Sequence, residues 1–492
     1  MKKSKIKTYF ALLLLFNITQ AQFLGSNLLE YQLGNLPDAE PKNLSTLYDQ
    51  LNLSYRFEYI SLNVKLEQFQ TADKSKSYEE LAQRSIRFRR NNLEVGIGNF
   101  YHIIGRGLLL RSYEIPGTTI EDIGFRTRSG FYRDIDGFFI KYDPEFAEFK
   151  AFRGNPLNNT LPPTLSDDFR RPNLLEGIEA NFYLTNWNFG GSYLRNNVQE
   201  DVKEYFSLNI SANLPLDIQL YSEYAQQTGE DNSLFDLSNH SAHAFYTGLN
   251  FLYDPFGMTF EYKDYNDFLL GFNDPPPLVK EHQYLLLNRL THRLIPLNES
   301  GWQTEIFYTL EAGHTVTVNI AEAVNETDVF RNIFKERFLE LYYKLNQNIS
   351  VKGFLDYSSE TKPVKENRYS GGLYTEGEFY RRWGAAIDLE YQTVERTILE
   401  KEKLQNTVAI LTISYAPDFS VGLIVERSND KLEVDTDEDV RYWVGGTLSY
   451  QYEQNIINIF YGSRRGGNAC TSGICYEILP FEGVEVRLTS IL

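Results

Sequence analysis

The chain has 492 residues, with 48 lysines and arginines against 66 aspartates and glutamates, so its formal net charge is −18. This acidity argues against nucleic acid as a partner, because phosphate contacts require clustered Lys and Arg. Two cysteines are too few for a disulfide scaffold or a multi-cysteine zinc module. Beyond the N-terminus no run of about 18 apolar residues occurs, which excludes a helical membrane protein.

The first 21 residues have the features of a secretory signal peptide. Four lysines precede position 8, residues 9–16 are apolar but too few to cross a bilayer, and residues 19–21 approximate a cleavage site. A buried first helix is the alternative interpretation. We expect residues 1–21 to be a signal peptide and residues 22–492 to form the mature domain.

Hydrophobic residues alternate with polar ones over nearly the whole mature chain. Leu339, Leu341 and Tyr343, for example, would share one face of a strand. Glu340 and Lys344 would share the other face. A period of two predicts half-buried β-strands, so the chain is expected to be all-β.

Two architectures produce this alternation, a soluble β-sandwich or propeller and a transmembrane β-barrel. Three features favour the barrel: the signal peptide, the Tyr and Phe residues that recur near strand ends, and the order of the connections. No internal repeat of fixed period indicates a propeller. We therefore predict an antiparallel outer-membrane barrel without a separate plug domain.

The connections alternate between short turns and long polar segments. Eleven turns and twelve long segments predict 24 strands, with two strands either way, if residues 270–301 form a single excursion. An even count places both termini in the periplasm. The other long segments include residues 112–135, 154–173, 196–203, 321–336, 394–406 and 464–482.

The polar face of each strand is expected to line the lumen, where charged rings and constrictions would set selectivity. The net acidity indicates a mild preference for cations. The candidate pore-lining and constriction residues are Arg87, Arg89, Arg106, Arg111, Glu261, Lys263, Glu340, Lys344, Lys352, Asp388, Glu390, Glu485 and Arg487.

The segment 84–133 is unusually basic, with nine arginines, no lysine and four acidic residues. Arg87 and Arg89 fall on one strand face and form a ladder. Guanidinium groups suit bidentate binding of carboxylates or phosphates, so a role in binding a solute or lipopolysaccharide is one interpretation. The other interpretation is that these arginines pair with the excess of acidic residues across the barrel wall.

Residues 93–111 are too many for one spanning strand, which needs about 10 residues. Gly96, Gly98, Gly105 and Gly107 permit bulges or bends within it. We infer that this region, with the connection 112–135, folds inward and narrows the pore. An ordinary curved strand remains the alternative.

Cys470 and Cys475 are five residues apart in a segment rich in glycine. In an oxidising compartment such a pair most simply forms one disulfide that closes a loop. A metal site would need further ligands nearby, and no histidine follows His314. We expect a disulfide and no metal or other cofactor.

Catalytic interpretations have little support. The six histidines show no Ser-His or metal-ligand spacing. His240 and His243 lie near Asp236 and Ser241, but in a connection where such residues are usually solvated. Residues 435–439 are acidic and lack the glycine of an EF-hand turn, so solvated charge is favoured over Ca²⁺ bridging to lipopolysaccharide. We expect no enzyme.

Two motifs resemble signatures of one family. The run Arg464 to Gly467, the two cysteines around a glycine and the closing strand 483–492 are similar to the C-terminus of an uncharacterised, porin-like family of Bacteroidota outer-membrane β-barrels. Residues 98–101 with 105–108 resemble the N-terminal signature of that family. The resemblance implies a fold and a bacterial outer-membrane location, and it implies no chemistry.

The function predicted from these observations is a porin-like channel or transporter for small polar solutes. The alternative is a non-enzymatic barrel subunit of an outer-membrane export, assembly or envelope complex, because barrels of 16–18 strands already leave an aqueous channel. A larger barrel without a plug would leak unless loops or a partner filled it. The expected partners are outer-membrane lipid, lipopolysaccharide and envelope proteins.

Overall fold

The computed structural model describes residues 22–492, except for 125, 162, 164–166, 199–200, 229–241, 276–279, 293–296, 312, 328–329, 399, 432–438 and 472. The predicted signal peptide, residues 1–21, lies outside the described residues. The description of the fold therefore begins at Gln22, where the first strand starts.

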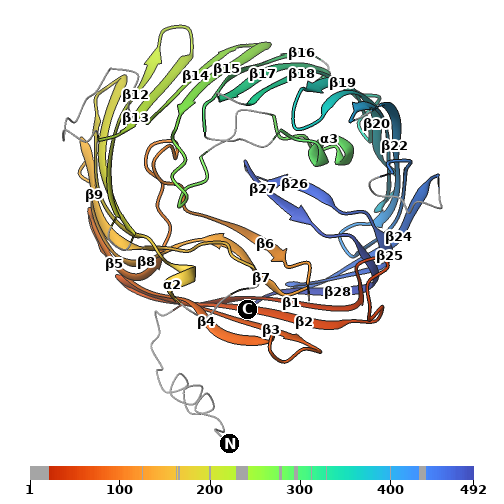
Figure 1. Cartoon of the computed structure of the whole chain (residues 1–492), viewed down its shortest axis with the longest axis horizontal. Coiled ribbons are helices and arrows are strands. Elements are labelled where there is room, and N and C mark those ends of the chain that lie inside the picture. Colours follow the sequence, from red (N-terminus) through yellow and green to blue (C-terminus); the bar gives the residue numbers. More distant parts are fainter. Residues whose placement is uncertain are drawn as a thin grey trace, which may run out of the picture.

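The described residues form a closed antiparallel barrel of 24 strands, seen end-on in Figure 1. Each wall strand pairs with its neighbour along the chain, and the last strand, β28 (Phe481–Ile491), pairs with the first, β1 (Gln22–Asn35). Closure of the ring leaves the wall without a terminal edge strand. The predicted fold class and strand number are confirmed.

The other wall strands follow in chain order. They are β2 (Ser45–Phe57), β3 (Ile60–Thr71), β4 (Tyr78–Arg90), β5 (Leu93–Phe100), β8 (Ile135–Tyr142), β9 (Ala147–Pro156), β10 (Leu174–Tyr183), β11 (Trp187–Val198), β12 (Asp201–Leu214), β13 (Ile218–Gln227), β14 (His243–Tyr253), β15 (Phe256–Asn266), β16 (Glu299–Thr309), β17 (Thr315–Thr327), β18 (Phe330–Lys344), β19 (Ile349–Glu360), β20 (Lys365–Tyr380), β21 (Trp383–Thr397), β22 (Lys401–Tyr415), β23 (Phe419–Ser428), β24 (Arg441–Tyr452) and β25 (Asn455–Arg464).

The alternation in sequence corresponds to two faces of the wall. On β18, Leu339, Leu341 and Tyr343 are exposed on the outside, whereas the intervening Glu340 faces the lumen. Leu355, opposite Leu339 on β19, is 64% exposed. A large exposed aliphatic side chain on every second residue is the pattern of a lipid-facing belt. The same row continues around the barrel in Ile86, Phe138, Ile178, Leu208, Leu373, Leu389, Leu411, Leu423 and Val444.

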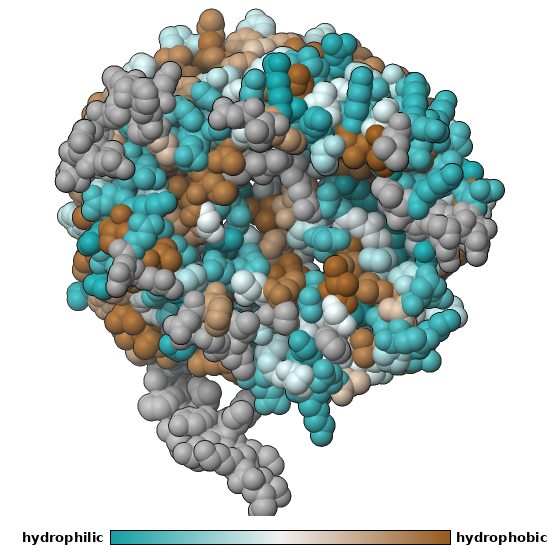
Figure 2. Space-filling model, in the orientation of Figure 1, coloured by the Kyte–Doolittle hydropathy of each residue, from teal (hydrophilic) through white to brown (hydrophobic). Residues whose placement is uncertain are grey.

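Exposed tyrosines flank this belt at both ends of the barrel. They have an apolar ring and a polar hydroxyl, which suits the interface between membrane and water. In the end-on view, hydrophilic residues cover much of the visible rim (Figure 2). The tyrosines near the short turns are Tyr253, Tyr308, Tyr343 and Tyr450, and those nearer the long connections are Tyr369, Tyr391, Tyr442 and Tyr461.

Several connections are shorter than predicted. The segments 196–203, 321–336 and 394–406 were predicted to be long, but the strands continue through most of each segment. We call the end of the barrel with the long connections the loop end. At this end the outward strand face also carries charged residues beyond the belt, such as the pair Glu322 and Lys335. The apolar–polar alternation in the sequence is therefore lost there, although the strands remain paired. The opposite end, the turn end, carries both Gln22 and Leu492.

Six further elements of the described residues lie outside the wall sheet. They are the strand pair β6 (Tyr113–Glu121) and β7 (Arg128–Arg133), the short helices α2 (Asp167–Arg170) and α3 (Leu285–Arg289), and the strand pair β26 (Gly467–Thr471) and β27 (Ile474–Ile478). In the described part of the chain, no helix has the length and hydrophobicity needed to cross a membrane.

Candidate functional site

Four segments from the loop end fold into the lumen, where Figure 1 shows them inside the ring of wall strands. We call residues 101–112 the hook, β6 with β7 the lumenal hairpin, residues 280–292 the strap, and β26 with β27 the disulfide hairpin. The predicted inward fold of the glycine-rich region is observed, because β5 ends at Phe100 and the chain then leaves the wall.

The hook reaches the wall strands from β9 to β15 and is held there by apolar and polar contacts. Ile104 and Leu108 are fully buried against inward-facing wall residues such as Leu194. At its tip, the backbone N–H of Arg106 donates to Glu223 Oε2 at 2.7 Å. Gly105 has φ +54°, and a Cβ there would lie 2.4 Å from the same oxygen. Only glycine therefore allows the chain to approach Glu223 so closely.

The lumenal hairpin is fixed to the wall by the arginines of the basic segment. Arg128 pairs with Glu30 of β1 at 2.6 Å and also with Glu121, while Arg126 pairs with Glu121 at 2.8 Å. Burial raises the pKa of the Glu121 carboxyl, but the two arginines outweigh burial and hold that pKa below its usual range. At these positions the arginines pair with acidic residues, which was one of the two interpretations of the segment.

The strap runs through the lumen and contacts wall strands on several sides. Both oxygens of Glu390, on β21, accept the first backbone N–H groups of α3, each at 2.8 Å. The Tyr284 hydroxyl donates to Glu340 of β18 at 2.6 Å. Arg289 forms a bidentate ion pair with Glu426 of β23. Three wall carboxylates therefore hold a helix of only five residues.

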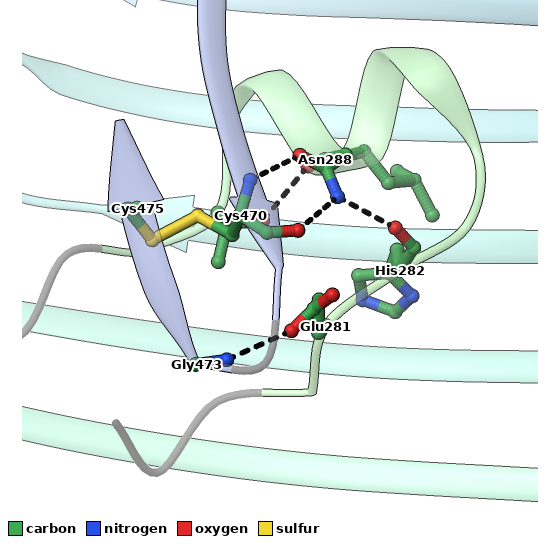
Figure 3. The surroundings of a disulfide bond; sticks show 8 residues. Glu281, His282, Asn288, Cys470, Gly473 and Cys475 are labelled. Carbon is green, nitrogen blue, oxygen red and sulfur yellow. Dashed lines mark hydrogen bonds between the residues drawn. A yellow bond between two sulfur atoms is a disulfide. The ribbon is translucent and has the colours of Figure 1, made fainter. Parts of the chain in front are cut away.

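The disulfide hairpin docks on the strap (Figure 3). Cys470 and Cys475 face each other across β26 and β27 and form the predicted disulfide. The Asn288 side chain accepts from the Cys470 N–H at 2.8 Å and donates to the Cys470 carbonyl at 3.2 Å. Glu281 accepts from the Gly473 N–H at 3.0 Å. The strap and the hairpin are thus one connected body across the lumen.

A cavity of about 990 Å³, called here the main cavity, lies between this body, the lumenal hairpin and the wall strands from β23 to β1. Its lining is charged but nearly balanced. Arg464 lies 3.5 Å from Glu485, and Arg487 pairs with Glu30. Such opposed charges create a strong local field without a net attraction for one sign of ion.

The predicted pore residues on the wall strands face the lumen, but they do not form one ring. Glu485 and Arg487 lie together in the main cavity. Glu340 and Glu390 bind the strap, and Asp388 lies next to Glu390 on the inner face of β21. Their proposed role in a conducting path stays a prediction.

The other predicted residues lie apart from the main cavity. Lys263 is buried in a pair with Glu299 at 2.7 Å. Lys344 lines an open recess at the turn end, and Lys352 lies over the Tyr374 ring, 5.7 Å from its centre.

The Arg87 and Arg89 ladder faces the lumen on β4, because Ile86 and Phe88 are exposed outside. The Arg111 N–H donates to Asn273 at the base of the hook.

Arg106 and Glu261 line a smaller recess of about 390 Å³ on the opposite side of the lumen. The Arg106 guanidinium lies over the Tyr221 ring, 5.0 Å from its centre. Gln303 donates to Glu261 at 2.6 Å, and the Tyr246 hydroxyl also donates to Glu261. The sequence analysis proposed both residues as pore-lining but gave no sign that they line the same recess.

Several important residues were missed by the sequence reasoning. Glu30 and Glu426 lie on strands whose alternation would have identified them as inward-facing. Arg289, Asn288 and Glu121 belong to connections, where no periodic pattern marks the residues that turn back into the barrel.

Within the described residues, no group of three or more histidine, cysteine and acidic side chains is arranged to hold a metal ion. His102 contacts Glu179 at 3.3 Å and so helps to anchor the hook. His243 begins β14 and stacks on Tyr224. Asp236, His240 and Ser241, which lie near His243 in the sequence, are outside the described residues, as are residues 435–438 of the acidic segment.

The chain is similar to the following solved structures. A chain of the Escherichia coli P pilus tip assembly intermediate PapC-PapD-PapK-PapG matches with a TM-score of 0.54 at 9% identity, over 95% of this chain and 60% of that chain. The P pilus usher (PapC) translocation pore gives 0.47 at 10% identity, over 96% and 99% of the two chains. Pseudomonas aeruginosa OccK5 (OpdH) gives 0.41 at 13% identity, over 73% and 98%. No curated protein sequence matches the chain.

The closed wall, the lipid-facing belt and the tyrosine rows define the class: this is a β-barrel of the outer-membrane type. Residues 38–492 match the family of unknown function DUF6029. The chain belongs to that family.

Proposed function

We propose that the protein is a porin-like channel or transporter for small polar solutes in a bacterial outer membrane, with both termini in the periplasm. The observation that supports this most strongly is the main cavity, an aqueous space of about 990 Å³ enclosed by a lipid-facing wall. Its walls carry opposed charges, and the proposed role involves no bond-making chemistry. In this proposal the protein is not an enzyme.

The inner segments give this channel its selectivity. They divide the lumen, so a solute must pass between fixed charges such as Arg464 and Glu426. Because both signs are present, the path favours polar solutes over apolar ones, and the overall acidity adds a mild preference for cations. Outside the belt, ion pairs such as Arg153 with Glu176 at 3.3 Å lie where lipopolysaccharide head groups would contact the barrel.

A second candidate function is a barrel subunit of an outer-membrane export, assembly or envelope complex. The inner segments favour this second function, because a barrel that does not conduct needs a lumen that is filled. The likeness to a chain of the P pilus assembly intermediate concerns the fold alone.

Planar-bilayer recording of the purified barrel tests the first proposal. We expect discrete conductance steps, and Arg464→Gln should shift the reversal potential in a KCl gradient towards cations because it removes a positive charge from the cavity. Arg382→Gln is the matched control, since Arg382 is half-exposed in a turn and pairs with Asp418.

The absence of conductance steps would overturn the channel. A stoichiometric partner isolated in mild detergent, together with that absence, would support the second candidate.

A further inference from the structure

The smaller recess, at the hook tip, is lined by side chains of a different kind from those of the main cavity. Besides Arg106 and Glu261, its lining consists mainly of amides, hydroxyls and aromatic rings. We call it the amide recess and define it by Asn188, Ser211, Asn213, Gln219, Asn250, Tyr221 and Tyr246 with Arg106 and Glu261. Its volume is about 390 Å³.

The strand register places three of these amides in one row. Gln219 of β13 is directly opposite Asn213 of β12 on one side and Asn250 of β14 on the other. Residues directly opposite in antiparallel strands have Cβ atoms about 5 Å apart on the same face. All three therefore project into the lumen side by side, as a strip of amide groups.

The side chains of these three amide residues are free to form hydrogen bonds with a solute in the lumen. In the described part of the chain, the side chains of Asn213, Gln219 and Asn250 make no hydrogen bond to protein, and all three residues are exposed. In the next row, Asn188 donates to the Ser211 hydroxyl at 3.1 Å. Each amide offers two donors and one acceptor oxygen, so the strip can both give and accept hydrogen bonds.

The two charged groups of the recess are held in place and balance each other. Arg106 lies over the Tyr221 ring, and its own backbone N–H is bound by Glu223. Glu261 accepts hydrogen bonds from Tyr246 and Gln303. One cation and one anion leave no net charge to attract an ion. The rings of Tyr221 and Tyr246, whose centres are 6.1 Å apart, add apolar surface between the polar groups.

The recess is reached from the turn end. A neighbouring space of about 600 Å³ shares Asn213, Gln219 and Asn250 with it and continues to Asp217 in the turn after β12. The amide strip therefore lies between the turn-end rim of the barrel and the hook. This position places the strip on the solute path of the proposed channel.

We infer that the amide recess binds a neutral polyhydroxylated solute, of the chemical class of short saccharides. A sugar hydroxyl both donates and accepts hydrogen bonds, as does each amide of the strip. The apolar C–H faces of a sugar ring are complementary to the tyrosine rings. Binding pockets of about 300–1,000 Å³ hold small organic ligands, so the recess has room for a short saccharide. This inference rests on the proposed channel for its biological role, but the binding itself requires no conduction.

Equilibrium binding tests the inference on the full mature barrel. The detergent should be lauryldimethylamine oxide, because a maltoside detergent presents the very head group under test. Isothermal titration would use maltose, maltotriose, cellobiose and xylobiose as neutral probes, and glucuronate and inorganic phosphate as charged ones. We expect saturable binding of at least one neutral probe and at least tenfold weaker binding of both charged probes.

Variants locate the binding. Gln219→Leu with Asn250→Leu should weaken binding of the neutral probe at least tenfold, and the milder single variant Gln219→Met should weaken it in the same direction. The matched control is Gln454→Leu, an amide in the turn between β24 and β25. Heat-modifiable migration in gels shows whether each variant has folded.

Three results would overturn the inference: no saturable binding of any neutral probe, equal binding of the charged probes, or full binding by both folded strip variants. The result is separate from that for the channel. A barrel that binds a saccharide but carries no current would contradict the proposed channel and leave the recess assigned. A barrel that conducts but binds no saccharide would support the proposed channel and overturn the assignment of the recess.

Discussion

The ion pair between Arg289 and Glu426 is the contact whose loss should release the strap. The Arg289 side chain is 11% exposed and that of Glu426 is 4% exposed, and the guanidinium binds the carboxylate through two nitrogens. Removing one partner of a buried ion pair typically costs about 3–5 kcal/mol, because the other charge stays buried without a partner. We expect Arg289→Met to destabilise the docked strap by an amount near the lower end of this range.

A loss of about 3 kcal/mol corresponds to a change of more than 100-fold in the equilibrium between docked and released strap. The amide hydrogens of residues 284–292 should therefore exchange faster by up to that factor, whereas those of distant wall strands such as β10 should not change. Hydrogen exchange with mass spectrometry on the barrel in detergent measures both sets in one experiment.

The double variant Arg289→Met with Glu426→Leu provides the control, because replacing both charges with apolar side chains leaves no charge unpaired. Hydrogen exchange of the strap in this double variant should return towards that of the unmodified protein. If Arg289→Met folds and its strap exchanges within threefold of the unmodified protein, the wall does not hold the strap through this pair.

Three further predictions concern other parts of the barrel. Leu373→Arg, in the lipid-facing belt, should lower the free energy of unfolding in lipid by about 2–4 kcal/mol if its row lies at the membrane midplane, and urea titration would show no loss if that face does not meet lipid. Cys470→Ser with Cys475→Ser should destabilise the disulfide hairpin by about 2 kcal/mol by the chain-entropy estimate for so short a loop; proteolysis within residues 467–478 should become faster, and an unchanged rate would refute this. His292, in the strap, bonds to Glu360 at 3.1 Å and lies 3.6 Å from Glu299; burial lowers its pKa, but these contacts outweigh burial and raise it above the ordinary value. Its stabilising effect is complete below the ordinary pKa and is lost as the pH rises through the raised one. The stability difference between the unmodified protein and His292→Gln should therefore shrink as the pH rises above the ordinary pKa of about 6.5, and a constant difference in urea midpoint would contradict this.

The wall could be predicted because its signal is local. A strand that faces lipid on one side must place an apolar residue at every second position, so β18 and β21 were recognisable from a few residues each. The strand number followed from counting such segments. The connections predicted too long, such as 321–336, show the limit of this signal. Beyond the belt the outward face carries charged residues such as Glu322 and Lys335 instead of apolar ones, so the strand ends resemble loops.

The contents of the lumen could be predicted only in outline. Four glycines and an excess of length indicated that residues 93–111 turn inward, and the cysteine spacing indicated a disulfide. The pairing of Arg128 with Glu30, or of Asn288 with the Cys470 backbone, joins residues about 100 and 182 positions apart in the chain. No periodicity or composition marks such partners.

The amino-acid sequence alone determined that this chain is a barrel, how many strands it has and which side chains face the lumen, because each of these depends on a repeat of two residues. Only the tertiary structure decided which charges meet inside, that the strap and the disulfide hairpin form one body, and that an amide-lined recess lies under the hook. Those features depend on where connections return within a closed ring, and the closure is a property of the whole chain.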